Sequence, residues 1–310
     1  MVVYLDYFAQ DYQESFRRKR SWELPSAIDC MLPIPDLPDL RVVPLESLVL
    51  HEQMDERRAP PLVVALQADG VLRNPPIVHP VSDRVERYVV LDGANRSTAF
   101  RLLGVPHILV QVVHAGNTSV RLETWNHVLS CMSAEELVQA LEHYPDLAII
   151  ASDLERADFN IASGASLAYL SLPDGRALEV VGETRPLGWR VQNLNALVDS
   201  YQALCRLSRT TARKAVGLEA VFPDISGLIV FPRFEQEEVI KAASAGWLLP
   251  AGLTRFVISP RALRINYPLD RLASAQPLEA KRAELDAWLR SRAEGRRVRF
   301  YAESTFLFDE

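Results

Sequence analysis

Residues 89–106 read VVLDGANRSTAFRLLGVP, and this stretch decides how the first part of the chain folds. The apolar residues 88–91 predict a buried strand, Asp92-Gly93 predicts a sharp turn, and 96–103 predict a helix that a glycine ends. The first N–H groups of a helix have no partner within the helix, so they favour an anion. The stretch therefore predicts a strand, a turn and a helix that can hold a phosphate.

Strands and helices alternate on both sides of this stretch. The predicted strands are 41–43, one that follows 73–78, 86–91 and 107–113, and the predicted helices are 56–68 and 96–103. The resulting order β-α-β-β-α-β predicts a compact α/β unit of about 90 residues. Residues 120–130 have the pattern of a strand or of the start of a helix.

We expect three parts in an α/β (α+β) protein: an extension over 1–39, a domain over 40–130 and a second, mixed α/β domain over 131–310. In the second domain, Pro173-Asp174-Gly175 predicts a hairpin between strands 167–172 and 177–181. The other predicted elements there are helices 134–143, 191–207, 211–218, 235–245 and 278–292 and strands 227–231 and 297–308.

The composition is that of an ordinary globular protein. The chain has 310 residues, of which 48% are hydrophobic and 24% charged, and its formal net charge is −6. Proteins that grip nucleic acid usually carry a basic face, and the nearest candidate here is the short cluster 17–20, for which a solvated helix end is the simpler interpretation. The cysteines Cys30, Cys131 and Cys205 form no CxxC pair, and no apolar run is long enough for a membrane helix. These features predict a cytoplasmic protein without membrane contact.

The turn after residue 91 lacks the glycines of a Walker loop or a Rossmann fingerprint. Arg96 lies in the first helical turn, where its guanidinium can fork onto phosphate oxygens, and Ser97 and Thr98 can add hydroxyl donors. The alternative is structural: Asp92 caps the helix and Arg96 pairs with a surface acid.

Three parts of the first domain together resemble the ParB/sulfiredoxin-like domain: 48–52, Gly70 with 75–78, and 90–96. Within that superfamily the chain most resembles the free serine kinases of siderophore clusters and archaea. The resemblance continues more loosely through 124–127 and through 252–256 with 261–266. It implies a kinase that uses ATP or ADP to convert free L-serine into O-phospho-L-serine.

The resemblance also implies roles on the nucleotide side. Glu52 matches the catalytic glutamate, which would orient the serine hydroxyl and accept its proton; the alternative is an ordinary surface glutamate. Asp92 would position the nucleophile or orient a metal-bound water. Magnesium would bridge the nucleotide phosphates, and we expect no metal site made by the protein alone. The residues expected to bind the phosphates are Gly93, Ala94, Asn95, Arg96, Ser97 and Thr98.

On the acceptor side, the resemblance implies that an aromatic residue packs against the amino acid and that a second segment completes the pocket. Trp125 matches that aromatic residue, although a tryptophan buried for stability is the ordinary alternative. His127 can be a core residue, a phosphate donor or neither. The residues expected to bind the substrate are His51, Trp125, His127, Thr254, Arg255 and Phe256.

Two residues depart from the pattern of the free serine kinases. Asn95 and Phe256 stand where that family usually has histidine. Asn95 can still donate a hydrogen bond, whereas Phe256 cannot. The acceptor is therefore L-serine or a related small hydroxy amino acid.

Two other functions fit parts of the pattern. A ParB-like nucleotide-binding regulator that contacts DNA requires a helix-turn-helix with basic recognition residues, and 131–225 contain no basic recognition helix. A sulfiredoxin-like reductase requires a nucleophilic cysteine in the turn, and 92–98 contain none. The serine kinase is the leading hypothesis.

Overall fold

The structure is a computed structural model, and it describes residues 37–54, 59–82, 85–114, 116, 119–130, 133, 135–136, 139, 144 and 146–300. Within it, Pro38–Val298 form one compact unit. Most of the predicted extension 1–39, the basic cluster 17–20 and most of the predicted helix 134–143 lie outside the described residues. The domain boundary at residue 130 remains a prediction.

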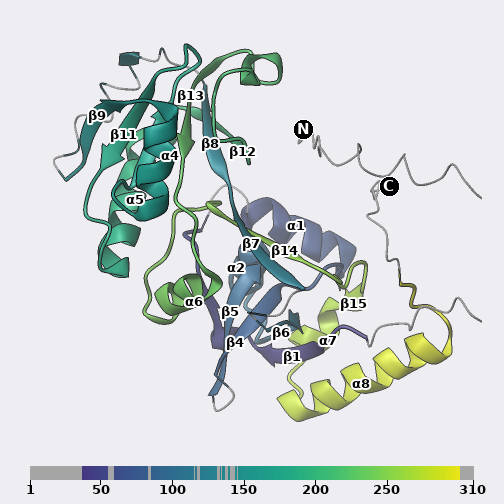
Figure 1. The fold of residues 1–310 in the computed structure, drawn as a ribbon. Coiled ribbons are helices and arrows are strands. Elements are labelled where there is room, and N and C mark those ends of the chain that lie inside the picture. Colours follow the sequence, from purple (N-terminus) through teal and green to yellow (C-terminus); the bar gives the residue numbers. More distant parts are fainter. Residues whose placement is uncertain are drawn as a thin grey trace, which may run out of the picture. The chain divides into compact units, whose positions relative to one another are not determined.

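A five-stranded sheet with the order β1-β6-β4-β5-β2 contains the opening stretch (Figure 1). Strand β5 pairs in parallel with β2 and antiparallel with β4. The predicted strands and helices occur in the predicted order, but two short strands, 48–50 and 71–72, were not predicted. The second helix begins at Ala94 because Gly93 precedes it in the left-handed conformation. The elements are β1 (Leu40–Pro44), the 3-10 helix η1 (Leu45–Ser47), β2 (Leu48–Leu50), α1 (Ala59–Asp69), β4 (Ile77–Ser82), β5 (Val85–Asp92), α2 (Ala94–Leu102) and β6 (His107–Val112).

Segments from the C-terminal part of the chain complete the core of this sheet. Leu272 of α7 (Leu269–Ala273) and Leu285 of α8 (Leu278–Glu294) are buried with Val90 and Phe100 in one hydrophobic cluster. A short ladder joins β3 (Val71–Leu72) to β15 (Tyr267–Pro268). Residues more than 150 positions apart in the sequence therefore stabilise the same sheet.

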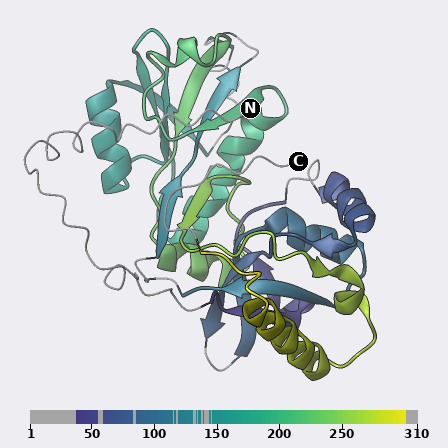
Figure 2. The same cartoon turned by 90° about the vertical axis from the view of Figure 1, so that its right-hand side faces the viewer.

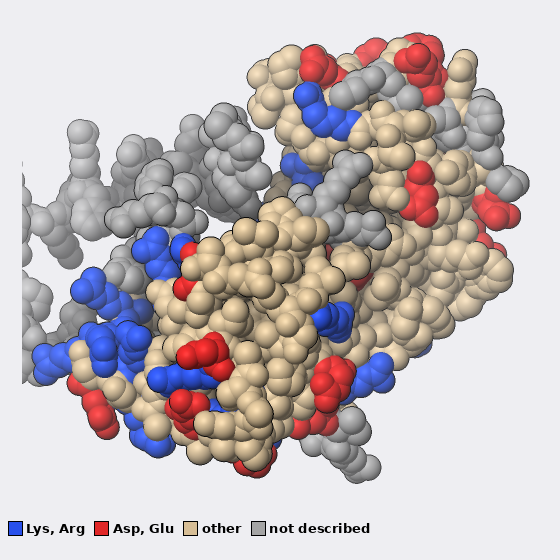
Figure 3. Space-filling view, turned by 180° about the vertical axis from the view of Figure 1, so that it is seen from behind, with Lys and Arg blue, Asp and Glu red and all other residues tan. Residues whose placement is uncertain are grey.

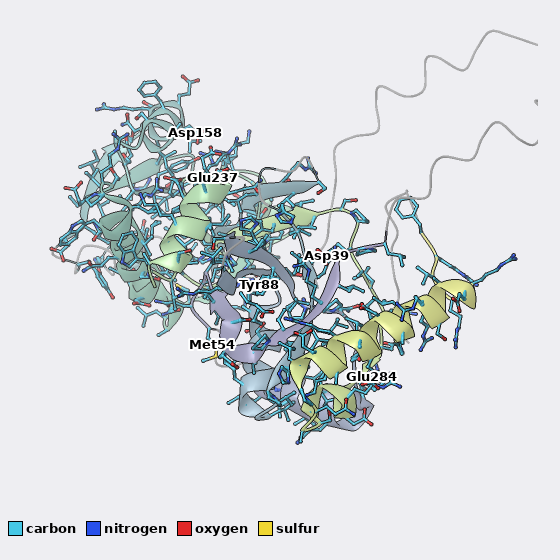
Figure 4. The ribbon with its side chains drawn as sticks, turned by 90° about the horizontal axis from the view of Figure 1, so that it is seen from below. Asp39, Met54, Tyr88, Asp158, Glu237 and Glu284 are labelled. Carbon is cyan, nitrogen blue, oxygen red and sulfur yellow. The ribbon has the colours of Figure 1, made fainter. Side chains whose placement is uncertain are left out.

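Helix α8 is held against β1 by polar contacts as well as apolar ones (Figure 4, where Glu284 marks the helix). The buried Lys281 Nζ donates to the Leu272 carbonyl at 2.6 Å and lies 3.0 Å from His107 Nδ1. Arg282 Nε donates to the Val42 carbonyl at 3.1 Å. Burial lowers the pKa of Lys281, because the charged ammonium loses water that these partners replace only in part.

The second large sheet of the protein has six strands in the order β12-β8-β13-β10-β11-β9. Alternate residues of its central strands point to opposite faces: Ile229 packs with α5, and Leu228 and Val230 pack with α4. The two helices therefore cover opposite faces of the sheet, which the turned view of Figure 2 shows. The elements are β8 (Asn126–Ser130), β9 (Ala148–Ser152), α4 (Leu154–Ser163), β10 (Ala168–Ser171), β11 (Ala177–Val181), α5 (Leu187–Gln202), β12 (Arg206–Thr210), the 3-10 helix η2 (Leu218–Ala220) and β13 (Ile225–Val230).

The prediction was wrong around residues 203–218. Helix α5 ends at Gln202, β12 follows, and most of the predicted helix 211–218 is irregular. Strand β12 is a polar edge strand that pairs with the buried β8, so tertiary pairing rather than local propensity decides its conformation. The predicted hairpin 167–181, strand 227–231 and helices 235–245 and 278–292 are confirmed. The predicted strand 297–308 has no strand over 297–300, and 301–310 lie outside the described residues.

One further ladder and one helix position the site. Strand β7 (Val120–Thr124) pairs antiparallel with β14 (Thr254–Ile258), so that Thr254 faces Thr124. Residues 120–130 are thus two strands, β7 and β8, separated at Trp125. Helix α6 (Gln236–Ser244) packs against β2 and β5 on the face opposite α2.

Candidate active site

Two neighbouring parallel strands deliver the two predicted carboxylates to the same edge of the five-stranded sheet. Leu48 pairs with Tyr88 and Leu50 with Val90. Asp92 is the last residue of β5, and Glu52 follows the last residue of β2 by two positions, so both carboxylates belong to the carboxyl ends of these two strands. This edge of parallel strands is where ligands commonly bind in α/β proteins.

The Glu52 carboxylate joins this edge to the segment before β14. Its Oε2 accepts a hydrogen bond from the Gly252 N–H at 2.8 Å, and its Oε1 accepts one from the Thr254 N–H at 2.7 Å. The Thr254 hydroxyl also donates to Oε1. The backbone of Glu52 bridges Leu249, and the side chain is only 14% exposed. Glu52 is therefore a buried, bonded carboxylate rather than a surface glutamate.

These hydrogen bonds control the ionisation of Glu52. Burial by itself raises the pKa of the carboxyl, but His51 and the hydrogen bonds from Thr254 outweigh burial and lower the pKa from 4.5 to about 2. Glu52 is therefore ionised at neutral pH. Among the described residues, Oε1 accepts two hydrogen bonds and Oε2 accepts one, so Oε2 has more capacity to accept a further donor.

His51 supports the same carboxylate from the protein interior. Its Nδ1 faces the Val90 carbonyl, and its Nε2 lies 2.7 Å from the Thr254 hydroxyl and 3.6 Å from Glu52 Oε1. The ring of Phe256 meets the His51 ring edge-on at a centroid distance of 5.6 Å. His51 and Phe256 are both almost fully buried, so the structure places them behind Glu52 and Thr254.

The turn after β5 has the geometry that an anion site requires. Gly93 adopts φ 96°, and a Cβ at this position would lie 3.0 Å from Pro76 Cα, so glycine suits both the backbone and the space. Helix α2 starts immediately afterwards with Ala94 and Asn95. The first N–H groups of the helix thus begin at the turn that carries Asp92.

Two arginines hold the Asp92 carboxylate. Arg96 Nη2 lies 3.2 Å from Asp92 Oδ2, and Arg261 Nη2 contacts the same oxygen. Arg96 also donates to the carbonyls of Asn74 and Pro75. The structural alternative expected Asp92 to cap the helix and Arg96 to pair with a surface acid. Arg96 does pair with an acid, which is Asp92 itself, but Asp92 does not cap α2, because Gly93 is the N-cap residue and no side-chain hydrogen bond caps the helix.

Arg261 is a site residue that the sequence interpretation did not name. It belongs to 261–266, the segment included in the resemblance, which offered the available signal. The buried Gln111 fixes this segment, because its Nε2 donates to the Pro260 carbonyl at 2.9 Å and its Oε1 accepts from the Ala262 N–H at 2.9 Å.

The two hydroxyls expected to bind phosphate point inward. Ser97 is fully buried and donates to the Gly93 carbonyl at 3.1 Å, and Thr98 is 5% exposed. The backbone of Gly93, Ala94 and Asn95 and the two guanidinium groups are better placed to meet a ligand than these hydroxyls.

Trp125, between β7 and β8, forms a stacked group with two charged residues. The backbone N–H of Trp125 donates to the Leu253 carbonyl at 2.8 Å, and the Arg255 guanidinium lies 4.7 Å from the centroid of the Trp125 ring. Arg255 Nη1 also bonds Glu123 Oε2 at 2.9 Å. Trp125 is half-buried, so the structure combines its packing role with partial access from outside.

His127 lies in the interior beside Gly252. Its Nδ1 is 2.9 Å from the Tyr201 hydroxyl, and Phe231 meets its ring edge-on. Burial and the charge of Arg209 lower the pKa of His127 to about 4, against a hydrogen bond to the Gly252 backbone and the charge of Glu52. His127 is therefore neutral at physiological pH, and its surroundings are those of a core histidine.

The part of the chain that the structure describes holds no group of three or more His, Cys, Asp or Glu side chains able to bind a metal ion. Magnesium often binds through one or two carboxylates together with substrate phosphates, so this arrangement fits a metal that arrives with a nucleotide.

No helix among the described residues is long and apolar enough to cross a membrane. Acidic and basic side chains are mixed over the face shown in Figure 3.

The chain is similar to known L-serine kinases. The ATP-dependent L-serine kinase SbnI of Staphylococcus aureus is 26% identical over 276 residues, which are 87% of this chain and 97% of that protein. The likeness to a serine kinase thus spans most of the chain. An ATP-dependent L-serine kinase of Staphylothermus marinus is 27% identical over 84 residues, 27% of this chain and 33% of that protein. No family model matches.

Solved structures agree with these relatives. SbnI of Staphylococcus aureus with a C-terminal truncation has a TM-score of 0.61 at 26% identity, and the match covers 83% of this chain and 96% of that chain. A mutant free serine kinase in complex with AMP has a TM-score of 0.66 at 16% identity, covering 77% and 98%, and shows likeness of fold. These findings support the resemblance to free serine kinases, while placement in the ParB/sulfiredoxin-like superfamily remains a prediction.

Proposed function

We propose that this protein is an ATP-dependent kinase that phosphorylates the hydroxyl of free L-serine to give O-phospho-L-serine. The similarity to the SbnI serine kinase over 87% of this chain and 97% of that protein carries the proposal. The carboxylate joined to the 252–254 segment supports it, because this kind of reaction needs a positioned acceptor for the hydroxyl proton. We place the reaction in the cytoplasm, in line with the cysteine pattern.

In the proposed reaction, the serine Oγ forms a bond to the γ-phosphorus while the bond from that phosphorus to the β–γ bridging oxygen breaks. ADP leaves, and the hydroxyl proton passes to Glu52. Oε2 is the atom that we assign to this proton, because it has a lone pair that Gly252 does not use. A carboxylate with a pKa of about 2 is a weak base, so Glu52 acts mainly by orienting the hydroxyl. Phosphoryl transfer with a loose transition state requires mainly such positioning.

The turn after β5, with Arg96 and Arg261, would stabilise the phosphates of the nucleotide. Arg96 and Arg261 bring two positive charges to the start of α2, and Asp92 sets their positions through its shared oxygen. When a nucleotide phosphate arrives, it can compete with Asp92 for these guanidinium groups. Magnesium would enter with the nucleotide, and Asp92 or Glu52 would be its nearest carboxylates; it would offset phosphate charge.

The test is to incubate the protein with magnesium, L-serine and either ATP or ADP, and to look for O-phospho-L-serine by mass spectrometry. We expect product with ATP and its loss in Glu52→Gln. Glu183→Gln is the matched control, because Glu183 is an exposed glutamate whose carboxylate accepts a hydrogen bond from the nearby Arg185 N–H at 3.2 Å. L-Threonine and L-homoserine in parallel reactions test the acceptor. Absence of product from L-serine with either nucleotide, or full activity in Glu52→Gln, contradicts the proposal.

A further inference from the structure

Strand β6 carries a buried amide, Gln111, in the middle of an apolar run. Residues 108–112 are all buried, and the other four are isoleucine, leucine or valine. The backbone of Gln111 pairs with Leu40 of β1 on one side and with Ile77 of β4 on the other. Burial of an amide costs free energy unless its polar atoms find partners, so the contacts of this side chain are informative.

The Gln111 amide bonds the backbone on either side of Arg261. Its Nε2 donates to the Pro260 carbonyl at 2.9 Å, and its Oε1 accepts from the Ala262 N–H at 2.9 Å. The partners fix the orientation of the amide, because a carbonyl can only accept and a backbone N–H can only donate. Two bonds to one short segment fix its orientation as well as its position, and so they set the direction in which the Arg261 side chain leaves the backbone.

The backbone of Gln111 holds the segment on the other side of the turn. Its N–H donates to the Pro76 carbonyl at 2.8 Å. The neighbouring Pro75 carbonyl accepts from Arg96 Nη1 at 3.0 Å. One residue of β6 is thus bonded both to the segment that anchors Arg96 and to the segment that carries Arg261.

Asp92 completes a closed ring of contacts. Arg96 Nη2 lies 3.2 Å from Asp92 Oδ2, and Arg261 Nη2 contacts the same oxygen. The separation of the two guanidinium groups is therefore set by Asp92 at one end of the ring and by Gln111 at the other. When a nucleotide phosphate competes with Asp92 for the arginines, the bonds from Gln111 still hold the segment of Arg261.

We infer that Gln111 is a positioning residue, which holds Arg261 at the distance from Arg96 at which both guanidinium groups can bind the nucleotide phosphates. This inference rests on the proposed function and adds to it a residue that acts through Arg261 rather than by touching the nucleotide. The bonds of Gln111 lie in the core and exist before the nucleotide arrives. They therefore reduce the conformational entropy that is lost when the nucleotide binds.

The experiment compares two substitutions of Gln111 with a matched control. Gln111→Met keeps the length of the side chain and removes both hydrogen bonds, and Gln111→Asn moves the amide back by one methylene. The control is Gln236→Met, because Gln236 of α6 makes the same kind of bridge between other backbone groups: it donates to the Val120 carbonyl at 2.9 Å and accepts from the Gly116 N–H at 3.2 Å. Thermal unfolding of each variant reports whether it folds.

The measurements are KM for ATP, KM for L-serine and, without L-serine, the Kd for ATP by titration calorimetry with magnesium. We expect Gln111→Met to raise KM and Kd for ATP by about 3- to 10-fold, the range for losing a neutral hydrogen bond. KM for L-serine should stay near the wild-type value, and Gln236→Met should leave all three constants near theirs. Gln111→Asn should show a smaller rise, and it replaces Gln111→Met as the test if that variant does not fold.

The double variant with Arg261→Ala separates positioning from a general structural role. Effects of two residues that act independently multiply, whereas effects of residues that act through one another do not. We expect Gln111→Met to raise the Kd for ATP little further once Arg261 is alanine.

Three outcomes would overturn the inference. An unchanged Kd for ATP in folded Gln111→Met shows that the amide does not position a phosphate-binding group. Losses that multiply in the double variant show that Gln111 does not act through Arg261. Equal rises in KM for ATP and for L-serine show a purely structural role. In each case the wild-type protein still makes O-phospho-L-serine, whereas the failure of the proposed function itself is seen as absence of that product in the wild type.

Discussion

The two halves of the site are built in different ways. The turn half, Asp92 with α2, comes from contiguous residues joined by one distant arginine. Its charged groups are partly exposed: the side chains of Asp92 and Arg261, which are 169 positions apart, are 38% and 37% accessible. The Glu52 half is formed by residues 200 and 202 positions apart, and its carboxylate is 14% accessible. A local, exposed turn can attract an anion, whereas a buried, long-range junction fixes the direction of one oxygen. The turn half therefore supplies charge, and the Glu52 half supplies orientation.

The largest effect is expected from Glu52→Gln on stability. The folded pKa of Glu52 is about 2 against 4.5 in the unfolded chain, so the carboxylate stabilises the fold above about pH 4.5 and loses this contribution as the pH falls towards 2. The shift corresponds to at most about 3 kcal/mol at pH 7. Urea unfolding at several pH values should show a wild-type advantage that is large at pH 7 and shrinks below pH 4. An advantage that does not change with pH would show that Glu52 is not the ionised group described here.

A somewhat smaller effect is expected from Thr254→Val, which keeps the shape and removes the hydroxyl between Glu52 and His51. Loss of one hydrogen bond to a buried charge costs about 1.5–3 kcal/mol, so kcat/KM should fall by about 10- to 100-fold. The acid limb of the pH–rate profile should also move to higher pH, since the hydroxyl lowers the pKa of Glu52.

Thr124→Val is the matched control for this change. Thr124 faces Thr254 across the β7–β14 ladder, and its hydroxyl donates to the Pro232 carbonyl at 3.4 Å. It should retain activity and the wild-type pH profile. Equal losses in both variants would assign the effect to the ladder rather than to the Glu52 carboxylate.

The smallest effect is expected on the turn side, from Arg261→Ala. The ion pair with Asp92 is partly exposed, and Arg96 remains to hold both Asp92 and a phosphate. We expect KM for ATP to rise about 5- to 10-fold, KM for L-serine to change little and the melting temperature to fall slightly. A larger rise in KM for L-serine than for ATP would show that the two halves do not divide the substrates in this way.

The difference between the halves also explains what the sequence can predict. The strand, Gly93 and α2 follow from neighbouring residues, and the structure confirms them. The meeting of Glu52 with Thr254 has no local signal, and the resemblance to serine kinases supplied it. Strand β12 was not predicted, because the end of the predicted helix 191–207 overlaps it, whereas pairing with β8 makes 206–210 a strand.

The inward direction of Ser97 shows a second limit. Its position in the first turn of α2 suggested a phosphate donor, but helical periodicity places it on the buried side, where it bonds the Gly93 carbonyl. Arg261 illustrates the reverse case, since an exposed arginine in a loop carries no signal of its partner. Both cases depend on which face of an element meets another element, and composition does not contain that information.

The contacts between Glu52 and residues 252–254 determine when the site can be completed during synthesis of the chain. During synthesis the turn at Asp92 can form as soon as the first strands and α2 have emerged, but the partners of Glu52 arrive only after the ribosome has passed Thr254. Until then the nascent chain holds the turn with Arg96, without the oriented Glu52 carboxylate and without Arg261, which follows Thr254 in the sequence. Catalytic competence is therefore acquired late, in a single long-range closure that no early fragment of the chain can make.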